Sequence, residues 1–122
     1  MSTYATAAER YFAAWNADGA EAIAKAVSEA FTEDAAYTDP LADVAGHDGI
    51  AAAVAGAQGR FPGFEFRLTG SVDGNHHIAR FSWELVSKAD GSSPAAGSDV
   101  VTLAEDGRIS TVSGFLDRVP GA

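Results

Sequence analysis

The apolar residues change their spacing about half way along the sequence. Up to about residue 60 the large apolar side chains recur three and four positions apart, as they do along one face of an α-helix. From residue 64 onward they alternate with polar residues, which is the pattern of half-buried β-strands. Because the helical segments come first and the strands follow, the chain is predicted to form an α+β fold with its helices on one face of a sheet.

Three helices are expected in the first half, over about residues 3–15, 20–30 and 48–58. Between the second and the third, Pro40 restricts the residue before it to extended geometry, so a short strand near Tyr37 is expected to end there. The segment 41–46 is expected to be a loop.

Four longer strands are expected to follow as an antiparallel meander. They span about residues 64–69, 78–85, 98–103 and 108–116. A strongly twisted sheet of this kind curls, and its concave face makes a natural pocket beneath the helices. No repeat and no composition shift divides the chain, so residues 1–122 are expected to be a single domain.

Charge and composition exclude several function classes. The chain has 8 Lys and Arg residues against 17 Asp and Glu residues, for a net charge of −9. Such a chain repels phosphate backbones and anionic lipid, so neither nucleic acid nor a membrane is expected as a partner. There is no cysteine for a disulfide or a thiolate metal site. No signal peptide is visible, so a cytoplasmic protein is expected.

Asp39 is the first candidate for a functional group, because it ends the expected strand just before Pro40. Tyr37 lies two positions earlier and shares its face of the strand. The alternative is that Asp39 only caps the turn beside the proline.

Two further candidates lie on apolar faces. Asp99 alternates with Val101 and Leu103, so its carboxyl group is expected to have a raised pKa. Tyr11 lies on the aromatic stripe of the first helix. The alternatives are that Asp99 bonds a neighbouring loop and that Tyr11 is simply part of the core.

The three histidines do not suggest a metal site. His76 and His77 are adjacent, so in a strand they would face opposite ways, and His47 is expected to be exposed. Scattered histidines of this kind lack metal-ligand spacing, so no metal is expected.

Three segments together resemble a known family. They are residues 10–17 around Tyr11, the stretch that ends Thr38-Asp39-Pro40, and the strand that starts at Asp99. The chain resembles the nuclear-transport-factor-2-like (NTF2-like) superfamily, in particular its SnoaL-like group, and is similar to bacterial Δ5-3-ketosteroid isomerases. The resemblance implies a cone of three N-terminal helices packed against a curved antiparallel sheet.

The resemblance also implies roles for three residues. Tyr11 matches the oxyanion-hole tyrosine, Asp39 the proton-shuttling base, and Asp99 the protonated aspartate of the isomerases. It therefore implies a cofactor-free isomerase of the ketosteroid isomerase type, which moves a proton alpha to a ketone in an apolar pocket.

The pocket is expected to bind an apolar molecule, a steroid if the resemblance extends that far. The residues expected to bind the substrate are Trp15, Phe81, Trp83, Val101, Val112, Gly114 and Leu116. Small residues on the last strand, where the isomerases have bulkier ones, would reshape the cavity. The alternatives are a non-catalytic binding or dimerisation domain of the SnoaL-like group and a polyketide cyclase-like enzyme.

The outer face of the sheet is expected to form a homodimer. The residues that could supply this contact are Arg80, Ser82, Glu84, Ser113 and Phe115. Alternatively, Arg80 and Glu84 would reach the pocket as an acid and its orienting partner, as in related epoxide hydrolases.

Overall fold

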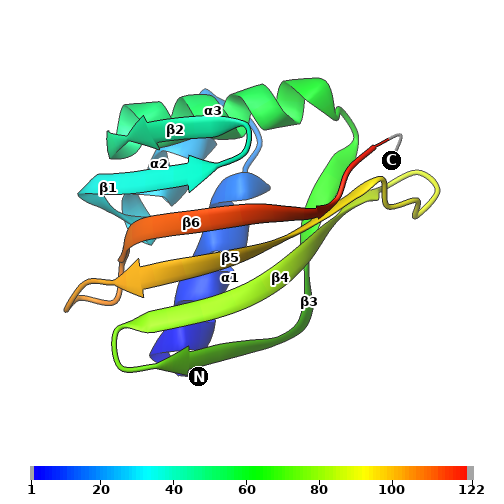
Figure 1. Cartoon of the computed structure of the whole chain (residues 1–122). Helices are drawn as coiled ribbons and strands as arrows, with labels where there is room; N and C mark the ends of the chain where they lie inside the picture. The colour runs from blue at the N-terminus through cyan, green and yellow to red at the C-terminus, as the bar shows by residue number, and fades with distance from the viewer. Residues whose placement is uncertain (1, 121–122) are drawn as a thin grey trace.

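The computed structural model describes residues 2–120, which form three helices and six strands (Figure 1). The helices are α1 (Thr3–Trp15), α2 (Ala20–Ala30) and α3 (Gly46–Arg60). The strands are β1 (Phe31–Asp39), β2 (Ala42–Ala45), β3 (Phe64–Asn75), β4 (Ile78–Ser87), β5 (Ala95–Leu103) and β6 (Ile109–Arg118). The three expected helices, the strand before Pro40 and the four longer strands after the third helix are confirmed.

The strands form one sheet in the order β2-β1-β6-β5-β4-β3. Strands β3 to β6 form the expected antiparallel meander. Strand β1 instead pairs with β6 in parallel, so the sheet is mixed and the antiparallel expectation is wrong for this pair. Residue alternation marks β1 as a strand, but the direction of its pairing depends on a partner more than seventy residues away.

Two turns also differ from the sequence-based expectation. The segment 41–46, expected as a loop, contains β2, which pairs with the end of β1 after a tight turn at Pro40 and Leu41. Strand β3 continues to Asn75, beyond its expected end near residue 69, so the turn before β4 is the short one at His76 and His77.

The aromatic stripe of α1 forms the centre of the core. Helix α1 crosses one face of the curved sheet, and α3 lies over the end that carries β1 and β2 (Figure 1). Tyr11 is 3% exposed, and its ring centroid lies 5.2 Å from that of Phe81 on β4 and 6.0 Å from that of Phe31 on β1. Burying several rings of this size is a main source of stability for a small domain.

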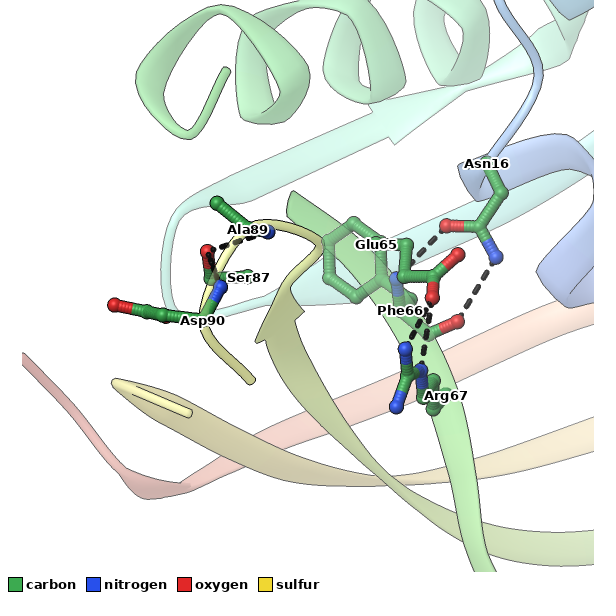
Figure 2. Close-up of polar contacts among 7 residues, drawn as sticks. All are labelled: Asn16, Glu65, Phe66, Arg67, Ser87, Ala89 and Asp90. Carbon is green, nitrogen blue, oxygen red and sulfur yellow. Dashed lines mark hydrogen bonds and ion pairs between the residues drawn. The ribbon is translucent and has the colours of Figure 1, made fainter. Parts of the chain in front are cut away.

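Asn16 fastens the end of α1 to the edge of the sheet. The Phe66 N–H donates to Asn16 Oδ1, and Asn16 Nδ2 donates to the Phe66 carbonyl, both at 2.8 Å (Figure 2). Its amide therefore pairs with β3 as a further strand would. The contact places Trp15, the preceding residue, against the Phe66 ring at a centroid distance of 5.3 Å.

None of the helices within residues 2–120 is long and apolar enough to cross a membrane.

Replacing Asn16 by Ala should destabilise the protein by about 1 kcal/mol, because two backbone groups of the edge strand lose their partners. Asn16→Asp keeps the acceptor for the Phe66 N–H but loses the donor, so its loss should be smaller. Urea unfolding measures both values. Asn75→Ala, at the exposed end of the same strand, is the control. An equal loss of stability in this variant would show that the Asn16 hydrogen bonds do not stabilise the contact between α1 and β3.

Candidate active site

A cavity of about 220 Å³ opens between α1, α3 and the concave face of the sheet. Its wall is mostly apolar and comes from α1, α3, all six strands, and the segments that follow β1, α3 and β6. The side chains with hydroxyl or charged groups on this wall are Tyr11, Tyr37, Asp39 and Arg60.

Asp39 both holds a turn and faces this cavity. Its Oδ1 accepts hydrogen bonds from the backbone N–H groups of Leu41 and Ala42, both at 2.8 Å. Its Oδ2 accepts a hydrogen bond of 2.5 Å from the Tyr37 hydroxyl. The turn-capping alternative is therefore correct as far as it goes, but the same side chain also lines the cavity.

Tyr11 joins the cavity wall to a buried carboxyl group. Its hydroxyl donates to Asp99 Oδ2 at 3.1 Å, and both residues are 3% exposed. Burial raises the pKa of the Tyr11 hydroxyl well above its usual value, and the Asp99 charge adds to this rise. Tyr11 is therefore a protonated donor at neutral pH.

Asp99 has the pKa expected of an acid on an apolar face. Burial raises the pKa of its carboxyl group to about 7, although the Tyr11 hydroxyl and the Trp83 indole favour the ionised form. The charge of Asp39 adds to the rise. Near neutral pH, Asp99 is therefore present in both protonation states.

Asp99 does not lie on the cavity wall; it lies behind Tyr11. It pairs with Gly114 across β5 and β6. A Cβ atom on Gly114 would lie 2.6 Å from Asp99 Oδ1 and 3.0 Å from the Asp39 Cβ. The bare backbone of β6 thus lets the two aspartates approach from the neighbouring strands.

Tyr37 is one site residue that sequence reasoning missed. It is 3% exposed, lines the cavity, and packs its ring 5.5 Å from Trp15. Burial raises the pKa of its hydroxyl far above the usual value, and the hydrogen bond to Asp39 adds to this effect. The spacing of two residues between Tyr37 and Asp39 was the available signal, but it identified a shared face and no function.

The residues expected to bind the substrate fall into two groups. Trp15, Trp83 and Leu116 are on the cavity wall. The other four are not among the wall residues: Phe81, Val101, Val112 and Gly114. Phe81 packs against Tyr11, and Val101 pairs with Val112 in the buried centre of the sheet, so these residues support the wall from behind.

Helix α3 contributes wall residues that the sequence did not indicate. They are Ala52, Ala53, Gly56, Ala57 and Arg60. Ile50 and Val54, on the same helix, are fully buried. The neighbouring face of small residues leaves the space that becomes the cavity.

The remaining polar candidates lie elsewhere. Arg80 is exposed and pairs with Asp73 across β3 and β4, and neither Arg80 nor Glu84 lines the cavity, so the epoxide hydrolase-like alternative is wrong. His47 is half-buried, with Nε2 2.9 Å from the Phe31 carbonyl oxygen, so its expected exposure is also wrong. Within residues 2–120, no group of three or more His, Asp or Glu side chains could hold a metal ion.

The raised pKa of Asp99 predicts a specific pH dependence of stability. Its carboxyl group ionises near 3.8 when exposed and at about 7 in the fold, so between these values the folded state binds more protons and stability falls as pH rises. The Asp99→Asn variant has no such loss of stability, and its amide oxygen can still accept the hydrogen bond from the Tyr11 hydroxyl. The difference in free energy of unfolding, variant minus wild type, should therefore increase by roughly 2 kcal/mol between pH 5 and pH 8.

Urea unfolding at several pH values measures this difference. Asp43→Asn, which changes an exposed carboxyl group in β2, is the control and should follow the wild-type curve. A constant gap between Asp99→Asn and wild type across the pH range would show that Asp99 does not titrate as described.

Comparisons with known proteins agree with this architecture. The family model of the SnoaL-like domain matches residues 8–112. A proposed isomerase of the SnoaL-like family from Agrobacterium tumefaciens strain C58 is 44% identical, with a TM-score of 0.90 over 96% of this chain and 99% of that one. No functionally curated protein matches the chain.

More distant structures share the fold alone. A proposed SnoaL-like polyketide cyclase from Jannaschia sp. CCS1 is 18% identical, with a TM-score of 0.75 over 94% of this chain and 85% of that one. An NTF2-like protein of unknown function from Exiguobacterium sp. 255-15 is 22% identical, with a TM-score of 0.71 over 91% and 98%. Since the family model spans most of the sequence and the 44% identical relative has the same shape along its whole length, the chain belongs to the family of SnoaL-like domains.

Proposed function

We propose that this protein is a cofactor-free isomerase, which moves a proton alpha to the carbonyl group of a compact apolar substrate. One observation carries the proposal: Asp39, with its carboxyl group, and Tyr11, with its hydroxyl group, are wall residues of the same largely apolar cavity. The first can accept a proton and the second can donate a hydrogen bond. The 44% identical relative, itself a proposed isomerase, supports this reaction class.

The proton-accepting atom is Asp39 Oδ2. Two backbone N–H groups occupy both lone pairs of Oδ1, whereas Oδ2 accepts only from Tyr37 and keeps one lone pair for the substrate. In the proposed reaction the C–H bond alpha to the carbonyl breaks, its proton moves to Oδ2, and its electron pair becomes part of an enolate. Return of the proton to another carbon completes the isomerisation.

Tyr11 donates to the oxygen of that enolate, and Asp99 controls this donor from behind. A neutral Asp99 can donate to the Tyr11 oxygen, which leaves the Tyr11 O–H free for the substrate and strengthens it. An ionised Asp99 accepts the Tyr11 O–H instead, as in the hydrogen bond between these two side chains described above. Asp99 therefore acts through Tyr11, and not by direct contact with the substrate as the resemblance implies.

The size of the cavity favours a compact substrate. Its volume of about 220 Å³ is below the roughly 300–1,000 Å³ of sites that enclose drug-sized ligands. A four-ring steroid would extend out of the mouth past Leu41 and Val119, which are 64% and 39% exposed. The second candidate function, ligand binding without turnover, is favoured by the hydrogen bonds that Tyr11 and Asp39 make to other side chains of the protein.

The isomerisation of cyclohex-3-enone to cyclohex-2-enone, followed by the absorbance of the conjugated product, tests the proposal. Asp39→Asn keeps an oxygen for the turn but removes the base, so kcat should fall about a hundredfold or more. Tyr11→Phe should cost roughly a hundredfold through loss of the oxyanion donor. Tyr37→Phe should lower kcat about tenfold and leave KM nearly unchanged, because Oδ2 loses its positioning partner.

Asp43→Asn is the matched control, since it removes a carboxyl group outside the cavity. An equal loss in Asp43→Asn, or turnover by Asp39→Asn at the wild-type rate, would refute the assignment of the base. Binding of the enone without any turnover by wild type would favour the second candidate function.

We also propose a homodimer formed through the outer face of the sheet. Phe115 on β6 and Val100 on β5 are 59% and 41% exposed, although both are large apolar residues near the middle of the sheet. Large exposed apolar side chains that lie together often mark a contact surface.

Phe115→Glu should therefore convert a dimer to a monomer, as measured by sedimentation velocity over a range of concentrations. Leu68→Glu, on the edge strand β3, is the control and should remain dimeric. A monomeric wild type at millimolar concentration would refute the dimer.

A further inference from the structure

We propose that the molecule bound in this cavity carries a carboxylate group, which pairs with Arg60 at the mouth. Two charged side chains line the cavity, Asp39 and Arg60, and the rest of the wall is apolar or aromatic. The inference rests on the proposed function only in taking the reacting molecule to occupy this cavity.

Arg60 belongs to the cavity wall by its position on α3. It is the last residue of the helix, and it follows Ala53, Gly56 and Ala57 at spacings of three and four, so all four lie on the same face. The small residues leave room beside the helix. Arg60 is exposed to solvent, so its charge lies where the cavity opens.

No contact within residues 2–120 accounts for the charge of Arg60. The ion pairs in this part of the chain join Arg67 to Glu65, Arg80 to Asp73 and Arg108 to Asp106. The Arg60 guanidinium group takes part in no ion pair and no side-chain hydrogen bond there. The positive charge of Arg60 would also be favourable simply because the residue lies at the C-terminal end of a helix. This helix-end explanation involves no ligand, and the experiment below distinguishes it from carboxylate binding.

The negative net charge of the protein makes the positive charge of Arg60 important for binding an anion. With a net charge of −9 and Asp39 on its wall, the cavity repels an anion unless a local cation offsets this field. The planar fork of a guanidinium group matches the two oxygens of one carboxylate. The preferred molecule is therefore an apolar ketone whose carboxylate stays near solvent at Arg60 while its carbonyl group reaches Tyr11.

The experiment compares two phenols that differ only in charge. The probes are 3-(4-hydroxyphenyl)propanoate and 3-(4-hydroxyphenyl)propanamide, whose phenol group can enter the cavity as a carbonyl analogue. Calorimetric titration at pH 6 and low salt should show the carboxylate bound about fivefold more tightly than the amide by wild type. In Arg60→Ala the ratio should fall to about one, and Arg60→Lys should keep part of it.

Arg80→Ala, which removes an exposed arginine on the outer face, is the matched control and should keep the wild-type ratio. High salt should weaken binding of the carboxylate and leave the amide unaffected. Equal affinities in wild type, a preference that survives Arg60→Ala, or binding of neither probe would each overturn the inference.

These outcomes are distinct from those that test the reaction. A carboxylate preference that depends on Arg60, in a protein without isomerase activity, would refute the proposed function and uphold this inference. Enone isomerisation that depends on Asp39, without any carboxylate preference, would uphold the proposed function and refute this inference.

Discussion

The absence of a side chain at Gly114 is the constraint on which the polar centre of this fold depends. Strand β6 lies between β1, which carries Asp39, and β5, which carries Asp99. Any Cβ at this position would meet both aspartates, at 3.0 Å or less. Gly97 has a similar role on the next strand, because a Cβ atom there would clash with the Trp83 ring. Two glycines on adjacent strands therefore make room for a carboxyl group and an indole beneath the aromatic stripe of α1.

Burying the carboxyl group of Asp99 and half-burying that of Asp39 is costly in a core of this size, and the tyrosines reduce the cost unequally. Asp39 has three donors, two of them backbone groups of its own turn, and it borders the cavity. Asp99 has the Tyr11 hydroxyl and the influence of the Trp83 indole, and it is enclosed. When two carboxyl groups lie close together, the less well solvated one takes the proton. Burial therefore raises the pKa of the Asp99 carboxyl group, and the nearby charge of Asp39 adds to this rise.

Much of this arrangement could be predicted from the sequence, and the remainder could not for physical reasons. Periodicity located the helices and the meander, Pro40 located the end of β1, and the apolar neighbours of Asp99 indicated its raised pKa. The parallel pairing of β1 with β6 depends on contacts between distant segments, which local patterns do not contain. The placement of Asp99 behind Tyr11 depends on how far each side chain lies from the cavity wall, and a resemblance between short motifs does not give this distance. Arg60 was missed because an arginine at a helix end is ordinary until the cavity beside it is known.

The two oxygens of Asp39 show how structural and chemical roles can be separated within one side chain. Oδ1 holds the turn after Pro40, and this turn brings β2 back alongside β1. Oδ2 points to Tyr37 and the cavity. An asparagine could keep the first set of contacts and would lose the charge needed for the second, whereas an alanine would lose both. The fold can therefore hold Asp39 rigidly through one oxygen and leave the other free for the proton transfer proposed above, a reaction that needs its base held in place before the reaction begins.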